Sequence, residues 1–473
     1  MKEFTNLQAI SPIDGRYRER VEELVPFYSQ FGLDKERVFV ELEYLIELAK
    51  LKEVKIQVPS EQLRQIFEDF DLEEAHLIHK IETEGYKEIP PTHHDVKAVE
   101  YYLREKLRDH NLEELLPFVH FGLTSEDVTN IAYGRLVKKS IQGPIIQALV
   151  DLLEQLVDLA EDNAAQPMLG RTHGQPATPT TVGKEFAIFI SRLLGELAKL
   201  RDRTGELTGK LAGATGNLSA HQDSFSQVDW IGFSEEFISR LGLVPKMAVT
   251  QIEPYDNLAS LFQALSRIDN ILVDLARDCW TYISREYFTQ QAVSGEVGSS
   301  TMPQKVNPID FENGEGNLSK ASSDLHFLAD YLTTSRMQRD LSDSTVRRNI
   351  GVAFAHSLIG YKSVLKGLRK IAPNLEKIND DLENHTEVLS ESWQTSMRKY
   401  GHIDAYEVVK ELVRGKELNY QEITELIDEL PLPTNEKARL KKLRPGDYVG
   451  LAEKITNHVI SDARKVLEEI DVK

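Results

Sequence analysis

Residues 258–287 read LASLFQALSRIDNILVDLARDCWTYISREY, and they give the clearest indication of the fold class. Apolar side chains recur here at spacings of three and four, which places them in one stripe along a helix. A helix of roughly 30 residues is about 45 Å long, and helices of that length usually belong to bundles or coiled coils. The stripe consists of Leu261, Leu265, Ile268, Leu272 and Leu275.

Four other segments show the same periodicity. The sequence contains no convincing run of period-two strands and no repeat of fixed length. We therefore predict an all-α protein with a long-helix bundle in its middle. The four further helical segments cover 144–160, 181–211, 318–332 and 352–371.

Two breaks in the periodicity suggest domain boundaries. The polar segment 111–117 follows an N-terminal helical region, and Pro373 ends the last bundle helix because the residue before a proline disfavours the α conformation. We expect two smaller helical domains to flank the bundle. The predicted domains are 1–111, 112–372 and 373–473.

The composition is ordinary for a soluble protein. The chain has 473 residues, of which 41% are apolar and 28% are charged, and its formal net charge is −20. This charge argues against nucleic-acid binding, although a local pocket can still attract a small anionic substrate. No stretch is apolar enough to span a membrane, and the N-terminus has no long apolar leader. The single cysteine, Cys279, fits a reducing, cytoplasmic setting and excludes a multi-cysteine metal site.

Residues 298–308, GSSTMPQKVNP, have the composition of a functional loop. Gly298 allows a free turn, and Pro303 and Pro308 break any helix. The loop carries one cation, several hydroxyls and an amide between apolar helical segments. From composition alone, a solvated surface loop is an equal alternative.

A second candidate is His173 in GRTHGQPAT, residues 170–178. Gly174 and Pro176 are expected to keep this histidine out of regular structure. Histidine is the side chain best suited to exchange a proton near neutral pH. An inert loop histidine is the alternative on the residues alone.

A third candidate is PTHHDVKAVEYY, residues 91–102. Asp95 suits a helix N-terminus, where its charge opposes the helix dipole. A capped helix start explains Asp95 but not the two adjacent histidines, His93 and His94. No further ligands with suitable spacing indicate a metal site.

These three segments resemble the fumarase/aspartase superfamily, whose members break C–N or C–O bonds and release fumarate. GSSTMPQKVNP resembles the superfamily's signature loop. GRTHGQPAT and HDVKAVEY are most similar to the bacterial adenylosuccinate lyase branch. One residue departs from that branch, because His93 stands where an asparagine is expected.

The resemblance implies roles for individual residues. It makes Ser299 the catalytic base and His173 the catalytic acid. Shorter matches extend it: DGRY at 14–17, TSED at 124–127 (by physics alone a capped helix start), TQIEPYD at 250–256, ENGEGN at 312–317 and SRMQRDLSDSTVRR at 335–348. The implied substrate-binding residues are Arg16, Tyr17, His93, His94, Asp95, Thr124, Ser125, Gln251, Lys305, Asn307, Asn313, Arg339, Ser344 and Arg348.

The resemblance also implies an activity and an assembly. Members of this branch split adenylosuccinate, and the succinylated aminoimidazole carboxamide ribotide (SAICAR), by β-elimination without cofactor or metal. They are homotetramers whose sites are each built from three subunits. The alternatives are another fumarate-releasing lyase, such as argininosuccinate lyase or fumarase, or a non-catalytic structural protein on the same fold. No Walker A loop, dinucleotide fingerprint or nucleophile elbow supports another enzyme class.

Overall fold

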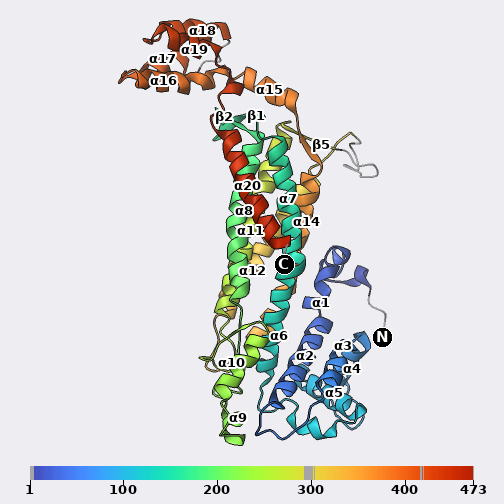
Figure 1. The fold of residues 1–473 in the computed structure, drawn as a ribbon. Coiled ribbons are helices and arrows are strands. Elements are labelled where there is room, and N and C mark those ends of the chain that lie inside the picture. The colour runs from blue at the N-terminus through green and yellow to red at the C-terminus, as the bar shows by residue number, and fades with distance from the viewer. Residues whose placement is uncertain (1–4, 292–301, 303, 416–417, 419, 472–473) are drawn as a thin grey trace. The chain divides into compact units, whose positions relative to one another are not determined.

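The computed structural model describes residues 5–291, 302, 304–415, 418 and 420–471. Helices make up most of the described chain, as predicted (Figure 1). By its internal contacts the chain divides into two units. Unit 1 comprises Met1–Ala148, Glu196–Asn270 and Asn317–Gly360, and unit 2 comprises Leu149–Gly195, Ile271–Gly316 and Tyr361–Lys473.

Five long helices contribute to both units, and Figure 1 shows each of them as one continuous element. All five lie where the apolar periodicity predicted them, with ends that differ by up to about nine residues. The longest, α11, has 29 residues. The five are α7 (Ile146–Asp162), α8 (Val182–Gly205), α11 (Asp256–Ser284), α12 (Ile309–Leu332) and α14 (Ile350–Leu368).

The N-terminal part of unit 1 has its own apolar core. Tyr102, Leu63 and Ile81 are fully buried in it, because α2 to α5 each turn one apolar face inward. The helices that lie wholly in unit 1 are α1 (Val25–Tyr28), α2 (Gln30–Leu48), α3 (Ser60–Glu68), α4 (Leu72–Thr83), α5 (Asp95–Asp109), α6 (Ser125–Ser140), α9 (Ser219–Ser224), α10 (Trp230–Arg240) and α13 (Ser342–Arg347).

Buried polar contacts fix how the long helices pack within unit 1. The hydroxyl of Ser357 on α14 donates to Oδ2 of Asp269 on α11 at 2.9 Å, and both side chains are fully buried. Ser266 on α11 and Ser322 on α12 share a hydrogen bond of 2.8 Å. A buried polar group without a hydrogen-bond partner costs free energy, so these bonds favour the observed helix register over registers shifted along the helix axis.

Unit 2 contains a group of short helices with a separate core around Trp393, which is fully buried (Figure 1). The basic run 436–444 lies largely on one of these helices. The group consists of α16 (Ser390–Lys399), α17 (Ala405–Val413), α18 (Tyr420–Glu429) and α19 (Thr434–Lys442), while α15 (Leu375–Glu383) precedes it and the 20-residue α20 (Ala452–Asp471) follows it in the chain.

The described residues also form three two-stranded sheets, which the sequence analysis did not predict. Their strands have only two to seven residues and lack apolar alternation, so they leave no period-two signal. The pairs are β1 (Pro167–Thr172) with β2 (Gln175–Thr181), antiparallel; β3 (Thr208–Gly209) with β4 (Val244–Pro245), parallel; and β5 (Phe288–Gln290) with β6 (Ile371–Pro373), antiparallel.

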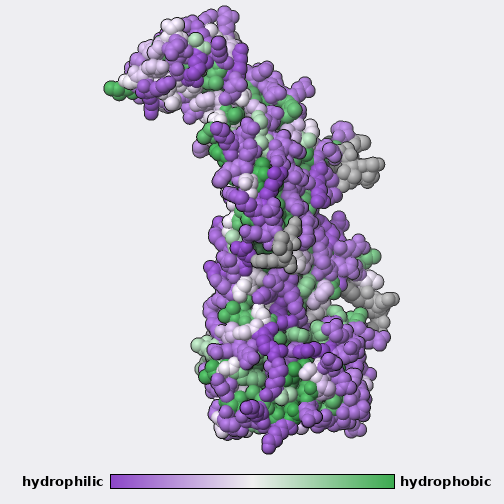
Figure 2. All heavy atoms as spheres, in the orientation of Figure 1, coloured by the Kyte–Doolittle hydropathy of each residue, from purple (hydrophilic) through white to green (hydrophobic). Residues whose placement is uncertain are grey.

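The visible face is mostly hydrophilic, with hydrophobic side chains in small groups (Figure 2). Among the described residues, no helix is both long and apolar enough to cross a membrane. The three domains predicted from sequence remain a prediction, because the division into units cuts through the long helices.

Candidate active site

Unit 1 joins two of the predicted binding residues directly. Asp95 opens α5, as predicted, and Nδ1 of His94 caps the helix by accepting the Lys97 N–H at 3.2 Å. The guanidinium of Arg348 donates to Oδ2 of Asp95 at 3.2 Å and to Oε1 of Gln30 at 3.1 Å. Arg348 and Asp95, 253 positions apart, therefore lie in contact.

A buried arginine holds Asp95 from the other side. Arg37, whose side chain is 3% exposed, donates to the same Oδ2 at 2.9 Å. Burial alone would raise the pKa of Asp95, but the charges of Arg37 and Arg348 and the N–H of Val96 hold that pKa at about 2. Asp95 therefore stays ionised and keeps the Arg348 guanidinium oriented.

A second contact joins Gln251 and Arg339. Nη1 of Arg339 donates to Oε1 of Gln251 at 3.2 Å, while Nε2 of Gln251 donates to the carbonyl of Ala214 at 2.9 Å. Because both ends of the amide are engaged, its orientation is set. Arg339 also lies 3.4 Å from a carboxylate oxygen of Glu126.

Glu126 belongs to a buried charge network that the sequence analysis missed. Its carboxylate accepts two bonds from Arg347, at 2.7 and 2.9 Å, and one from the hydroxyl of Tyr255. Arg347 also lies 3.0 Å from Asp343. Burial opposes ionisation of Glu126, but the charge and hydrogen bonds of Arg347 outweigh the effect of burial and lower the pKa of the Glu126 carboxyl. The network thus links Arg339 to the start of α6.

The helix start predicted at TSED is present, but its acids point inward. The carboxylate of Asp127 accepts the N–H of Thr124 at 2.9 Å, which caps α6. The same carboxylate lies 2.7 Å from Nζ of Lys210, and both side chains are fully buried. An acidic residue in the first turn of a helix is usually explained by its favourable interaction with the helix dipole. The sequence therefore provides no indication that Asp127 and Lys210 form a buried ion pair.

The remaining predicted residues of unit 1 are less connected. Ser344 lies on α13, and Ser125 is the first residue of α6. Arg16 and His93 are exposed, Tyr17 is half-buried, and His93 has a positive φ of 49°. Within the described parts of the chain, no side-chain bond joins these last three to the other predicted residues.

In unit 2, His173 sits at the tip of the β1–β2 hairpin. His173 and Gly174 form its two-residue turn with φ of 52° and 75°, the positive values that a type I′ turn requires. His173 is exposed, as a residue that exchanges protons with a ligand must be. His173 itself lies outside both strands, as expected, although Pro176 lies within β2, in a two-stranded ribbon where every strand is an edge.

The hairpin also depends on a close backbone approach. A Cβ at position 170 would lie 2.3 Å from the carbonyl oxygen of Thr178, so only glycine fits there. The register shifts between Met168 and Gly170, at the same place. The glycines of the motif are thus required by the turn and by the strand pairing.

The signature loop lies partly outside the described residues. Ser299, the predicted base, is among the residues not described. Lys305 is exposed, Asn307 is half-buried, and Asn313 on α12 accepts a hydrogen bond of 2.8 Å from Ser363. Among the described residues, no group of three His, Cys, Asp or Glu is placed to hold a metal ion.

The two units therefore present different chemistry. Unit 1 gathers two partly exposed arginines, Arg339 and Arg348, with amide and carboxylate partners, which suits the binding of phosphate or carboxylate groups. Unit 2 presents an exposed histidine on a defined turn, which suits proton transfer.

Known protein families match almost the whole chain. A family model described as lyase matches residues 31–322, and one described as adenylosuccinate lyase C-terminal matches residues 335–449. The chain is 46% identical over 463 residues to the adenylosuccinate lyase of Dictyostelium discoideum and 44% identical over 457 residues to that of Escherichia coli strain K12. Each alignment covers 95% of this chain and 98% of the relative.

Solved structures share the fold at lower identity. The fumarate lyase from Mesorhizobium sp. BNC1 aligns with a TM-score of 0.71 and 19% identity, over 94% of this chain and 97% of that one. The 3-carboxy-cis,cis-muconate lactonizing enzyme from Pseudomonas putida gives 0.70 and 20% over the same shares. At such identities the likeness concerns the fold alone.

Proposed function

We propose, since the chain belongs to the adenylosuccinate lyase family, that it splits adenylosuccinate into AMP and fumarate, and SAICAR into its carboxamide product and fumarate. The observation that carries the proposal is the identity of 46% and 44% to two adenylosuccinate lyases over nearly the full length of both chains. The enzyme would act in purine biosynthesis as a C–N lyase.

The proposed reaction is a β-elimination. The alkoxide of Ser299 removes a proton from the carbon beside a carboxylate, and that electron pair forms the double bond of fumarate. The C–N bond breaks, and His173 donates a proton to the departing nitrogen. Lys305 and Asn307 bind the carboxylate that takes up negative charge, and the cation and nearby amides also stabilise the serine alkoxide, so that more of the serine is deprotonated and can act as the base. This route requires neither metal nor cofactor.

The phosphate and carboxylate groups of the substrate are anionic, so we expect cationic side chains to bind them. We assign Arg16, Arg339 and Arg348 to the phosphate and carboxylates, with bidentate geometry where it is available. The contacts of Arg339 with Gln251 and of Arg348 with Asp95 support this assignment, because they hold both guanidinium groups ready before substrate arrives. Tyr17, His93, His94, Thr124, Ser125, Asn313 and Ser344 complete the proposed binding set.

The proposal also covers the cellular location and the quaternary structure. We infer a cytoplasmic homotetramer of three-domain subunits with shared active sites. Ile188 on α8, Trp280 on α11 and Phe327 on α12 are exposed hydrophobic side chains of the kind that a partner subunit covers.

Purified protein incubated with adenylosuccinate tests the activity. We expect fumarate and AMP in equal amounts, followed by the change in purine absorbance. Ser299→Ala and His173→Ala should each lower kcat by about 10²- to 10⁴-fold, because each removes one positioned proton-transfer group.

Two controls separate the alternatives. Turnover of argininosuccinate or malate, with none of adenylosuccinate, would identify a different fumarate-releasing lyase. Inertness toward all three substrates in a correctly assembled protein would favour the non-catalytic structural alternative.

A further inference from the structure

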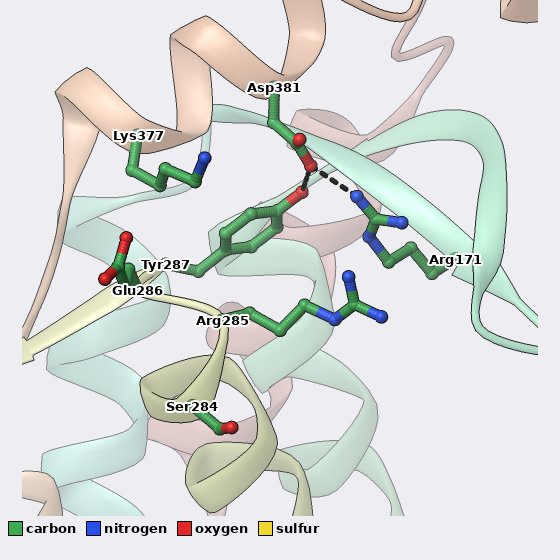
Figure 3. A pocket seen from close by; sticks show the side chains of 7 residues that line it. All are labelled: Arg171, Ser284, Arg285, Glu286, Tyr287, Lys377 and Asp381. Carbon is green, nitrogen blue, oxygen red and sulfur yellow. Dashed lines mark hydrogen bonds and ion pairs between the residues drawn. The ribbon is translucent and has the colours of Figure 1, made fainter.

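The hairpin that carries His173 borders a polar cleft in unit 2 (Figure 3). Asp381 on α15 lies in it, and Figure 3 shows Arg171 and Tyr287 pointing at this one carboxylate from different elements. Nη2 of Arg171 donates to Oδ2 of Asp381 at 2.5 Å, and the hydroxyl of Tyr287 donates to the same oxygen. The three residues come from β1, from the segment between α11 and β5, and from α15.

Arg171 continues this chain of contacts into the turn. It stands two positions before His173, and its Nη1 lies 3.4 Å from the carbonyl oxygen of Gly174, the other turn residue. One guanidinium therefore contacts both α15 and the turn that presents the histidine. On the second strand, the hydroxyl of Thr178 donates to Glu391 at 2.6 Å, so both strands are tied to the C-terminal helical region.

Charge and burial favour a lasting contact. The side chains of Arg171 and Asp381 are only 19% and 14% exposed, so water screens their attraction weakly. Burial opposes ionisation of Asp381, but its bonds with Tyr287 and Arg171 prevail and lower its pKa. Burial and the bond to Asp381 raise the pKa of Tyr287 to about 12, so the phenol keeps its proton and remains a donor. Lys377 and Arg285 border the same cleft.

We propose that Asp381 and Tyr287 are positioning residues for proton transfer, which act through Arg171 to hold the His173–Gly174 turn. This inference rests on the proposed function, in which His173 protonates the departing nitrogen. A two-residue turn at the end of a ribbon has few contacts of its own. The Asp381 carboxylate supplies an anchor, and Tyr287 restricts that carboxylate to one orientation.

Two conservative variants test the proposal. Asp381→Asn removes the charge, and Tyr287→Phe removes only the hydroxyl that aims the carboxylate. We expect kcat for adenylosuccinate to fall about tenfold to a hundredfold with Asp381→Asn and by less with Tyr287→Phe, because a displaced acid transfers its proton slowly. KM should stay nearly constant, because the altered residues do not bind substrate.

The solvent deuterium isotope effect on kcat separates positioning from general loosening. When transfer of a proton to nitrogen becomes slower, this effect should rise in both variants above that of the unaltered protein. Asp380→Asn is the matched control, since Asp380 is the preceding residue of α15 and its side chain is 60% exposed. It should leave kcat and the isotope effect unchanged.

The outcomes are distinguishable. If Asp381→Asn and Tyr287→Phe keep the kcat of the unaltered protein while His173→Ala is inactive, the positioning role is overturned and the proposed function is not. A lowered kcat with an unchanged isotope effect would also overturn it, since that result indicates a loss of properly folded sites. Full activity of His173→Ala would instead overturn the assignment of the acid in the proposed function, and this inference with it.

Discussion

Arg347 and Arg348 are neighbours in the sequence but differ in environment. The side chain of Arg347 is 1% exposed and faces Glu126 and Asp343, whereas that of Arg348 is 48% exposed and faces Asp95. The buried arginine holds helices together, and the exposed one remains available to a ligand. Two identical side chains at adjacent positions thus have separate structural and functional roles.

This difference predicts unequal costs for the same substitution. Arg347→Met should lower the free energy of unfolding at pH 7 by about 3–5 kcal/mol, because it removes the cation that lies nearest to the buried carboxylates of Glu126 and Asp343. Arg348→Met is the matched control and should cost at most about 1 kcal/mol, since its ion pair is half exposed. Urea unfolding of both variants at equal protein concentration measures the difference.

The deficit of Arg347→Met should also depend on pH. In the unaltered protein the pKa of Glu126 is lowered on folding, so its contribution is complete above the pKa of the unfolded chain and is lost as pH falls through the folded value. Without Arg347, only the Tyr255 hydroxyl and the more distant Arg339 still favour the carboxylate, so burial should raise the pKa of Glu126, and protonation then relieves the poorly compensated charge. The gap between variant and unaltered protein should therefore narrow from pH 7 to pH 5. A gap of constant size would contradict this account.

At the residue scale, motif matching identified candidates but not their contacts. It singled out Arg339 and Arg348, and the structure shows each of them partly exposed and held by its own polar partners. It missed Glu126 and Arg347, because a buried charged residue in a helix has the same sequence appearance as a solvated one, and it missed their partner Tyr255. Only tertiary packing determines which arginine turns inward.

At the scale of elements, the β1–β2 hairpin departs most from expectation. The sequence analysis correctly placed His173 between two long helices, and the structure adds that a tight hairpin presents it. Period-3.6 stripes predicted α7, α8, α11, α12 and α14, because each helix buries one face. The hairpin buries little and includes prolines, so its order depends on turn geometry and on contacts with α15 and α16.

The turn predicts a backbone effect at Gly174. Its φ of 75° is in the left-handed region, and a Cβ there would meet no atom within 4 Å. Gly174→Ala should therefore cost about 1–2 kcal/mol from backbone strain alone, and should lower kcat by displacing His173. Gly174→Asn should retain more stability and activity, since asparagine tolerates this conformation. Thermal unfolding would measure the loss of stability, and steady-state kinetics would measure the fall in kcat. Equal stability and equal kcat of the Ala and Asn proteins would argue against backbone strain as the cause.

At the scale of the whole molecule, the proposed catalytic pair is 126 positions apart, from His173 to Ser299. Residues so distant meet only through packing, either within one chain or between subunits. The proposed function includes shared sites built from several subunits, and the exposed hydrophobic side chains of the long helices are consistent with that proposal. These two arrangements give opposite results when differently inactivated chains are mixed.

The mixing experiment uses His173→Ala and Ser299→Ala, each inactive alone. Equal amounts are co-expressed with different tags, and hybrid oligomers are purified through both tags and verified by native mass spectrometry. If the two residues of a site come from different subunits, roughly a quarter of the sites in a random mixture receive both intact residues, because each is intact in half of the chains. Fumarate release should then recover to about that fraction of the unaltered rate. If one subunit supplies both residues, every site carries one defect, and verified hybrids should remain as inactive as their parents.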